Sequence, residues 1–157
     1  MFQTTENDAC ELLDADHVAV KHLFVEYARL AFAMPDRSAG ERTRLAQQIC
    51  DELTVHAQVE EEIFYPALRK ASPDAAAQLD EAKAEHQEAK KMIARIRGMQ
   101  AGPEMDDLVG KLAGAIEHHV KEERDVLFPK ARSCGLDLGA LSARMRERQQ
   151  ALQGAAA

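Results

Sequence analysis

The sequence is poor in the residues that build β structure and tight turns. It has no Trp, 5 Phe, 2 Tyr, 8 Gly and 5 Pro among 157 residues. Sandwiches and barrels need aromatic residues in their strands and frequent turns between them. The sequence therefore excludes those folds and predicts an all-α protein, with a length that suits one domain.

Basic stretches, paired cysteines and long apolar runs are also missing. A formal net charge of −7 makes nucleic acid and anionic membranes unexpected partners. The longest near-apolar run, Leu30–Met34, is far shorter than the roughly 20 residues that span a bilayer, and the acidic start does not resemble a signal peptide. Cys10, Cys50 and Cys134 form no CxxC motif or disulfide framework. We therefore expect reduced thiols in a cytoplasmic protein.

What the sequence does have is helical periodicity in four long segments. Apolar residues recur at steps of three and four, which is the spacing of one helix face. These segments begin near residues 9, 40, 73 and 103 and are separated by short breaks. They predict an up-down-up-down four-helix bundle within residues 1–135. Residues 136–157 hold a shorter pattern, Leu138–Leu152, which predicts an extra C-terminal helix packed on the bundle or in a dimer contact, and residues 154–157 are expected to fray.

The second half of the chain repeats the first. The segment HAQVEEEIFYP at His56–Pro66 aligns with HVKEERDVLFP at His119–Pro129, at an offset of 63, and Asp14–Lys21 aligns with Lys83–Lys90 at an offset of 69. Each half contributes one lone histidine and one His-x-x-x-Glu motif. All six residues fall on the apolar helix faces: His17, His56, Glu60, His86, His119 and Glu123.

Acidic and imidazole side chains on apolar faces need an explanation. Residues four apart stand one turn apart on the same side of a helix, and a carboxylate in an apolar core costs several kcal/mol unless a charge compensates it. Only Lys21 and Lys90 lie at the edges of these faces. One core histidine or one helical His–Glu pair is commonplace, but six in register are not. Metal ions would supply the charge, and this donor set suits iron, manganese or zinc.

The other polar and aromatic candidates have simpler interpretations. His118 offers a competing register with Glu122, but its face is polar, so we place it in solvent together with His22. The remaining acids of the two motifs are assigned to a solvated face, from which they can also support the ligands, and both tyrosines to packing: Glu61, Glu62, Glu122, Tyr27 and Tyr65.

The combined pattern resembles the hemerythrin-like HHE cation-binding family over about residues 10–131. The resemblance implies a non-haem di-iron centre with an oxo or hydroxo bridge, and it makes His17, His56, Glu60, His86, His119 and Glu123 the ligands. Oxygen-carrying hemerythrins have a second histidine one turn after the lone histidine of the third helix, where this chain has Lys90. The sequence therefore resembles the symmetric HHE branch, and reversible oxygen transport is disfavoured.

Ligand counting leaves open coordination positions at such a centre, which is what separates a reactive site from a sealed one. We therefore predict a protein, monomeric or homodimeric, that binds or senses O₂, peroxide, NO or iron level. Two alternatives use the same residues. One is a di-iron peroxidase or NO-reducing enzyme, and the other is a structural or interaction module that a metal, zinc or manganese included, only clamps together.

Overall fold

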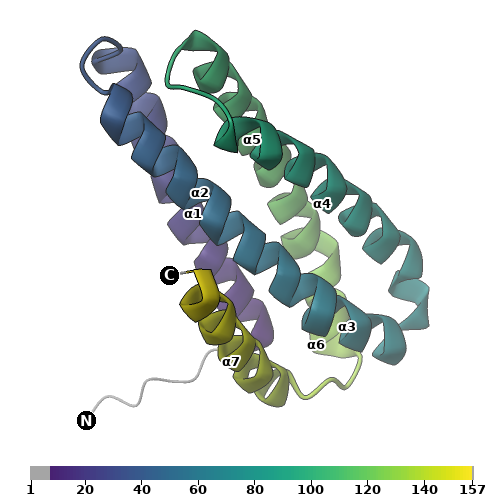
Figure 1. Ribbon diagram of the computed structural model, residues 1–157. Coiled ribbons are helices and arrows are strands. Elements are labelled where there is room, and N and C mark those ends of the chain that lie inside the picture. The colour runs from purple at the N-terminus through teal and green to yellow at the C-terminus, as the bar shows by residue number, and fades with distance from the viewer. Residues whose placement is uncertain (1–7, 157) are drawn as a thin grey trace.

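The computed structural model describes residues 8–156, and this part of the chain is all-helical, without a strand. Five long helices carry the fold (Figure 1): α1 (Ala9–Ala33), α2 (Ala39–Val59), α4 (Ala76–Arg97), α5 (Pro103–Glu122) and α7 (Leu138–Ala156). The shorter elements are the π-helices η1 (Glu60–Phe64) and η3 (Glu123–Leu127), the α-helices α3 (Tyr65–Ala71) and α6 (Phe128–Ser133), and the 3₁₀ turn η2 (Pro73–Ala75). No helix of residues 8–156 is both long enough and apolar enough to cross a membrane.

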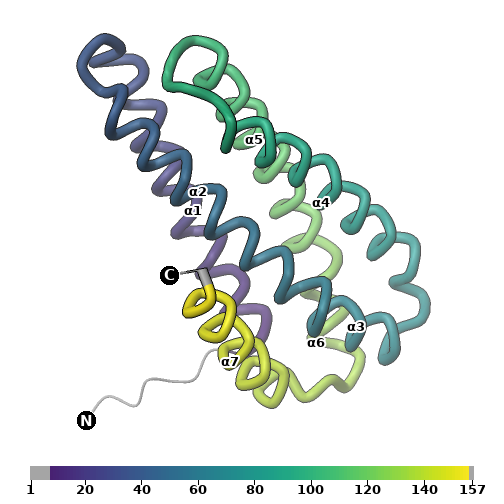
Figure 2. Tube along the Cα trace, in the orientation of Figure 1, coloured from purple at the N-terminus to yellow at the C-terminus, as the bar shows by residue number. Residues whose placement is uncertain are grey.

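The chain forms two helical hairpins that pack on each other (Figure 2). The α1–α2 hairpin contacts the α4–α5 hairpin through α1 against α5 and α2 against α4. The C-terminal helix α7 packs back on α1, α2 and η1 and buries Leu141 and Met145. It is helical to Ala156, and the fraying expected for residues 154–157 stays a prediction. Residue 157 lies outside the described part.

The core is divided into two hydrophobic clusters with a polar layer between them. One cluster, which includes Leu13, Phe64 and Met145, fills the end where α7 packs. The other, which includes Leu30 and Leu112, fills the end where the two hairpins turn. Each of α1, α2 and α4, and α5 with its continuation η3, passes from one cluster to the other at a buried histidine: His17, His56, His86 and His119. The apolar packing on both sides therefore fixes the position of these histidines along the helix axes.

The predicted second and fourth helices are each interrupted by a π turn, which the periodicity did not indicate. The turns begin at Glu60 and Glu123, where the backbone N–H of the residue five positions later donates to the glutamate carbonyl. A proline follows each turn, at Pro66 and Pro129. A proline ring clashes with the carbonyl four residues before it in an α-helix, and widening the turn relieves that clash. Such π turns are frequent at functional sites.

A buried network ties α1 to α5 at the hairpin-turn end. Asp106 accepts a hydrogen bond of 2.6 Å from the Tyr27 hydroxyl and bonds of 2.7 and 2.8 Å from Arg42. Tyr27 is thus a packing residue with one polar anchor. Tyr27→Phe is expected to lower the free energy of unfolding by ~1–2 kcal/mol, because one hydrogen bond to a charged group is lost. Urea denaturation measures this, and unchanged stability would contradict the role given to the hydroxyl.

Candidate metal centre

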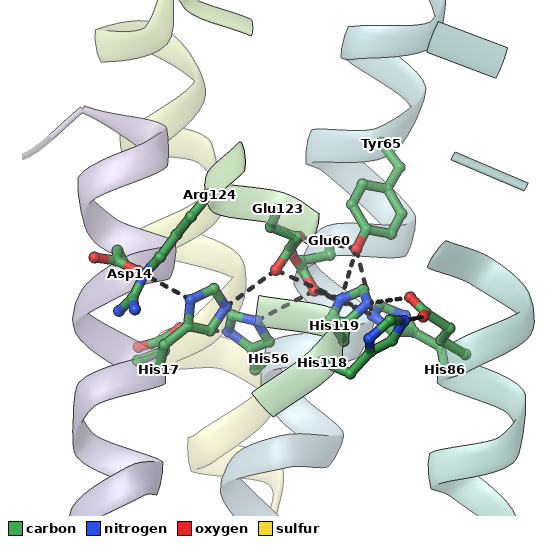
Figure 3. Close-up of polar contacts among 12 residues, drawn as sticks. Asp14, His17, His56, Glu60, Tyr65, His86, His118, His119, Glu123 and Arg124 are labelled. Atoms are coloured by element: carbon green, nitrogen blue, oxygen red, sulfur yellow. Dashed lines mark hydrogen bonds and ion pairs between the residues drawn. The ribbon is translucent and has the colours of Figure 1, made fainter. Parts of the chain in front are cut away.

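All six sequence-predicted residues converge in the middle of the protein (Figure 3). We call them the central cluster, and none is more than 7% exposed: His17, His56, Glu60, His86, His119 and Glu123. They come from α1, α2, α4 and α5 and from the first residue of each π-helix. The two segments of the sequence repeat therefore face each other across the core, and each glutamate stands where its helix widens.

The ligand atoms form two adjoining groups that share Glu60. In the first, His17 Nε2 lies 3.0 Å from Glu123 Oε1, and His56 Nε2 lies 3.2 Å from Glu60 Oε1. In the second, Glu60 Oε1 lies 3.2 Å from His86 Nε2 and 3.8 Å from His119 Nε2. The atoms of each group lie within 4.8 Å of one another, so each group can hold a metal ion.

The opposite ring nitrogen of each histidine in the central cluster meets a carboxylate. The Nδ1 atoms contact four acids: His17 contacts Asp14 at 3.1 Å, His56 contacts Asp16 at 2.9 Å, His86 contacts Glu61 at 3.2 Å, and His119 contacts Glu85 at 2.8 Å. An acid at Nδ1 holds the proton there, which leaves the Nε2 lone pair free and fixes the ring orientation. All four imidazoles are therefore arranged to present a lone pair to the centre.

When each histidine carries its single proton on Nδ1, the centre lacks hydrogen-bond donors for the acceptors it buries. Within the described residues, five buried atoms of the central cluster have no hydrogen-bond partner: His17 Nε2, His56 Nε2, both carboxylate oxygens of Glu60, and Glu123 Oε1. Buried acceptors without donors cost free energy, and buried charges without partners cost more. Cations among these atoms would satisfy them all, so the residues fit a metal centre.

The surrounding charges also favour cations. We call the four acids at the histidine Nδ1 atoms the outer acids, and two of them are neutralised. Arg124 donates to Asp14 at 2.7 Å, and Lys90 donates to Glu61 at 2.9 Å. Asp16 and Glu85 have no Lys or Arg partner among the described residues. Together with the two central glutamates they leave a surplus of negative charge, which divalent or trivalent ions would balance.

Protonation compensates part of this surplus negative charge when no cation is bound. Burial, together with the neighbouring Glu60 carboxylate, raises the pKa of Glu123. Burial acts against the charged forms of Glu60 and His56 as well, but their mutual attraction holds the pKa of Glu60 well below its usual range and raises that of His56 well above it. Burial likewise opposes a charged His119, yet Glu60 and Glu123 raise its pKa to about 10.

Tyr65, interpreted from the sequence as a packing residue, also lies at the centre. Its hydroxyl donates to Glu123 Oε2 at 2.9 Å and lies 3.2 Å from His119 Nε2 and 3.4 Å from His86 Nε2. Residues five apart do not share a face in an α-helix, but the π turn η1 brings Tyr65 round to the side of Glu60. Burial and the two central carboxylates raise the pKa of Tyr65 well above its usual range, so the phenol keeps its proton.

The repeat makes the two sides of the centre unlike. Phe128 occupies the position that corresponds to Tyr65, and its ring stacks on His17 with centroids 6.1 Å apart and an interplanar angle of 13°. The sequence shows this difference, because Tyr precedes one proline and Phe the other. It does not show where either ring lies relative to the centre. His118 and His22 are exposed, as predicted, whereas Glu61 is half-buried and supports His86 rather than facing solvent.

Comparison with known proteins agrees with this geometry. The model of the hemerythrin HHE cation-binding domain matches residues 8–131. The chain belongs to the hemerythrin HHE cation-binding family. A solved HHE cation-binding domain-containing protein from Mycobacterium kansasii superposes with a TM-score of 0.76 at 26% identity, covering 96% of this chain and 90% of that one.

A longer relative is a protein described as a DNA nickase from Nostoc sp., which is 34% identical over 87 residues. The match covers 55% of this chain but only 24% of the Nostoc protein. The HHE chain therefore spans about a quarter of that relative.

The outer acids of this HHE domain give a direct test of its metal-binding geometry. Asp16→Ala is expected to weaken cation binding by about 10–100-fold, because His56 loses the acid that fixes its tautomer and orientation. Competition with a chelator of known affinity measures the change. Asp36→Ala, at an exposed loop acid, is the matched control, and equal affinities of the two variants would contradict the role of Asp16.

Proposed function

We propose that this HHE domain holds two iron ions in the central cluster, with an oxo or hydroxo bridge, and that it binds or senses a small oxidant such as O₂, peroxide or NO. The six residues of the cluster are the proposed ligands. Residues 1–135 would form an up-down-up-down four-helix bundle around them, and residues 136–157 an extension. Zinc or manganese also suits these donors.

An apolar cavity next to the imidazoles carries this proposal. Its volume is about 30 Å³, and all four histidines of the central cluster line it. The rest of its wall is largely aliphatic, with Val20, Leu53, Ile93 and Ile116. A space of this size holds one or two small molecules, and its apolar wall favours a neutral diatomic over bulk water. Iron, when bound, supplies electrons and open coordination positions.

The residues of the chain hold protons and orient the donors. Four imidazoles present Nε2 toward the centre because the outer acids hold Nδ1–H. Tyr65 keeps a proton on its hydroxyl oxygen beside Glu123. Lys90, at the position of the second histidine of oxygen-carrying hemerythrins, is paired with Glu61 at the cavity wall. This arrangement supports ligand sensing over oxygen carriage.

Anaerobic reconstitution with Fe(II), followed by exposure to air, tests the proposal. We expect about two iron ions per chain and the absorption of a bridged di-ferric centre. Iron well below that ratio and no such band would refute it.

Filling the cavity separates ligand binding from a purely structural clamp. Ala89 is buried at the cavity wall, and Ala89→Leu is expected to weaken NO binding to the iron-loaded protein by roughly 10–100-fold, because overpacking costs about 1–3 kcal/mol. Val20→Ala, which enlarges the same cavity, is the matched variant and should not weaken NO binding. Equal affinities of the two variants, with iron retained, would favour the clamp.

A peroxide- or NO-reducing enzyme is the second candidate, and Tyr65 is the observation that favours it. Its buried hydroxyl donates to Glu123 beside the donor set, so it can also donate a hydrogen bond to a peroxide or NO molecule there. Steady-state turnover by the iron-loaded protein, and its loss in Tyr65→Phe, would support the enzyme. The nickase activity named for the Nostoc relative is not proposed here, because a net charge of −7 disfavours DNA.

A further inference from the structure

A second group of donor residues lies outside the central cluster, on the outer side of α4 and α5. We call it the outer cluster: Glu81, Glu85, His118 and Glu122. One ligand atom from each lies within 4.8 Å of the others. His118 Nε2 is 3.3 Å from Glu85 Oε2 and 3.2 Å from Glu122 Oε1. None of the three carboxylates has a Lys or Arg partner among residues 8–156.

The outer cluster touches the central cluster directly. Glu85 contacts His118 with one carboxylate oxygen and His119 Nδ1 with the other, the latter at 2.8 Å. His118 and His119 are neighbours in the chain, and Figure 3 shows both projecting from the same helix. A cation held by the outer cluster would therefore be separated from the buried donor His119 by one shared residue, Glu85.

A cavity of about 110 Å³ is lined by two residues from each cluster. Glu81 and Glu122 line its outer part, and His119 and Glu123 line it from the central cluster. Glu123 is 0% exposed, and its Oε1 has no hydrogen-bond partner. The Oε1 of Gln78, on the same cavity wall, is also buried without a partner. Buried acceptors without donors along a cavity require water or a cation.

The sequence repeat shows that the other side of the protein is closed at the same place. At offsets of 69 and 63 the outer-cluster positions become Leu12, Asp16, Val55 and Val59. The three apolar residues pack in the hydrophobic cluster to which α7 contributes. Gln149 of α7 donates to the remaining acid, Asp16, at 3.3 Å. The acid that holds a histidine Nδ1 is thus kept in both halves, but only the α4–α5 side has the three further donors.

We propose that the outer cluster is a binding site for hydrated divalent cations that passes them through this cavity to the central cluster. The inference rests on the proposed cation binding by the central cluster. Three carboxylates and an imidazole suit Fe²⁺, Mn²⁺ or Co²⁺, and their unneutralised charge raises the local cation concentration and the rate of capture. Because the outer cluster is partly exposed, it can release its cation, whereas the buried central cluster retains the cations that it binds.

Cation uptake by the metal-free protein tests the proposal. The variant Glu81→Gln, His118→Gln, Glu122→Gln removes three donors and leaves Glu85 on His119. Uptake of Co²⁺, followed by stopped-flow absorbance, is expected to slow about tenfold, the low end of electrostatic focusing. After desalting, which removes the cation of the partly exposed outer cluster, the wild type and the variant should contain the same amount of cobalt. The control His22→Gln, Asp36→Asn, Asp107→Asn removes the same charge from exposed positions elsewhere and should load like the wild type.

A titration with Mn²⁺ measures the outer cluster directly. The cobalt-loaded wild type is expected to bind one further Mn²⁺, seen as loss of the free Mn²⁺ electron paramagnetic resonance signal, and the triple variant is not. Equal loading rates, or no further Mn²⁺ bound by the wild type, would overturn the inference. If the central cluster takes up no Co²⁺ at all, the proposed function fails instead, and Mn²⁺ binding to the metal-free protein still reports on the outer cluster.

Discussion

Glu123→Gln is expected to stabilise the metal-free protein by ~1–2 kcal/mol and, in the same variant, to weaken cation binding by roughly 10²–10³-fold. Glu123 is fully buried with one oxygen unpartnered, and burial raises its pKa, so the ionised carboxylate disfavours the folded metal-free state. Glutamine keeps the shape and the hydrogen bond from Tyr65 without the charge. With cations present, losing the carboxylate resembles breaking a buried ion pair, at about 3–5 kcal/mol.

The matched variant Glu60→Gln is expected to have the opposite effect on the metal-free protein. The pKa of Glu60 is held well below its usual range by His56, so its carboxylate stabilises the folded state even without a cation. Urea denaturation with and without chelator, and competition with a metal indicator, measure both variants. If both substitutions lowered the stability of the metal-free protein alike, the assignment of an unpaired charge to Glu123 would be wrong.

Cation binding is expected to release about two protons per chain near neutral pH, because His56 and His119 must give up a proton to become ligands. The pKa of His56 is raised well above its usual range, and that of His119 to about 10. Proton release measured with a pH indicator in weak buffer tests this. His22→Gln, at an exposed histidine, should release the same number as the wild type.

The same two histidines set the pH dependence of the metal-free protein. A histidine whose pKa is raised on folding stabilises the protein fully below its unfolded pKa, near 6.5, and this stabilisation is lost as the pH rises through the folded value. The melting temperature of the metal-free protein is therefore expected to fall by several degrees between about pH 7 and pH 10. The cation-loaded protein should show no such fall, and a parallel fall in both forms would contradict the explanation.

The central cluster could be predicted because the same pattern, a lone histidine and a His-x-x-x-Glu motif, occurs in both halves of the sequence. His17 and His86, and the His-x-x-x-Glu pairs that begin at His56 and His119, follow the α-helical spacing up to each glutamate. Local periodicity is sufficient there, since residues four apart share a face. The two hydrophobic clusters then needed only the apolar pattern on either side of the histidines.

Tyr65 could not be predicted, because the α-helical period fails at the π turn that begins at Glu60. The prolines that follow the two motifs were visible, but a proline is compatible with a break, a kink or a wider turn. Asp16 and Glu85 were missed for a different reason. Each stands beside a histidine in the sequence but binds a histidine of the next long helix, His56 or His119.

The sequence by itself determined the helical class and the six donors of the central cluster, because helix periodicity is a local property that repeats within four residues. The tertiary structure decided which acid holds which ring nitrogen, which side of the centre α7 covers, and that the outer cluster stays uncovered. Those choices depend on the rotation and spacing of helices far apart in the chain, and packing sets both.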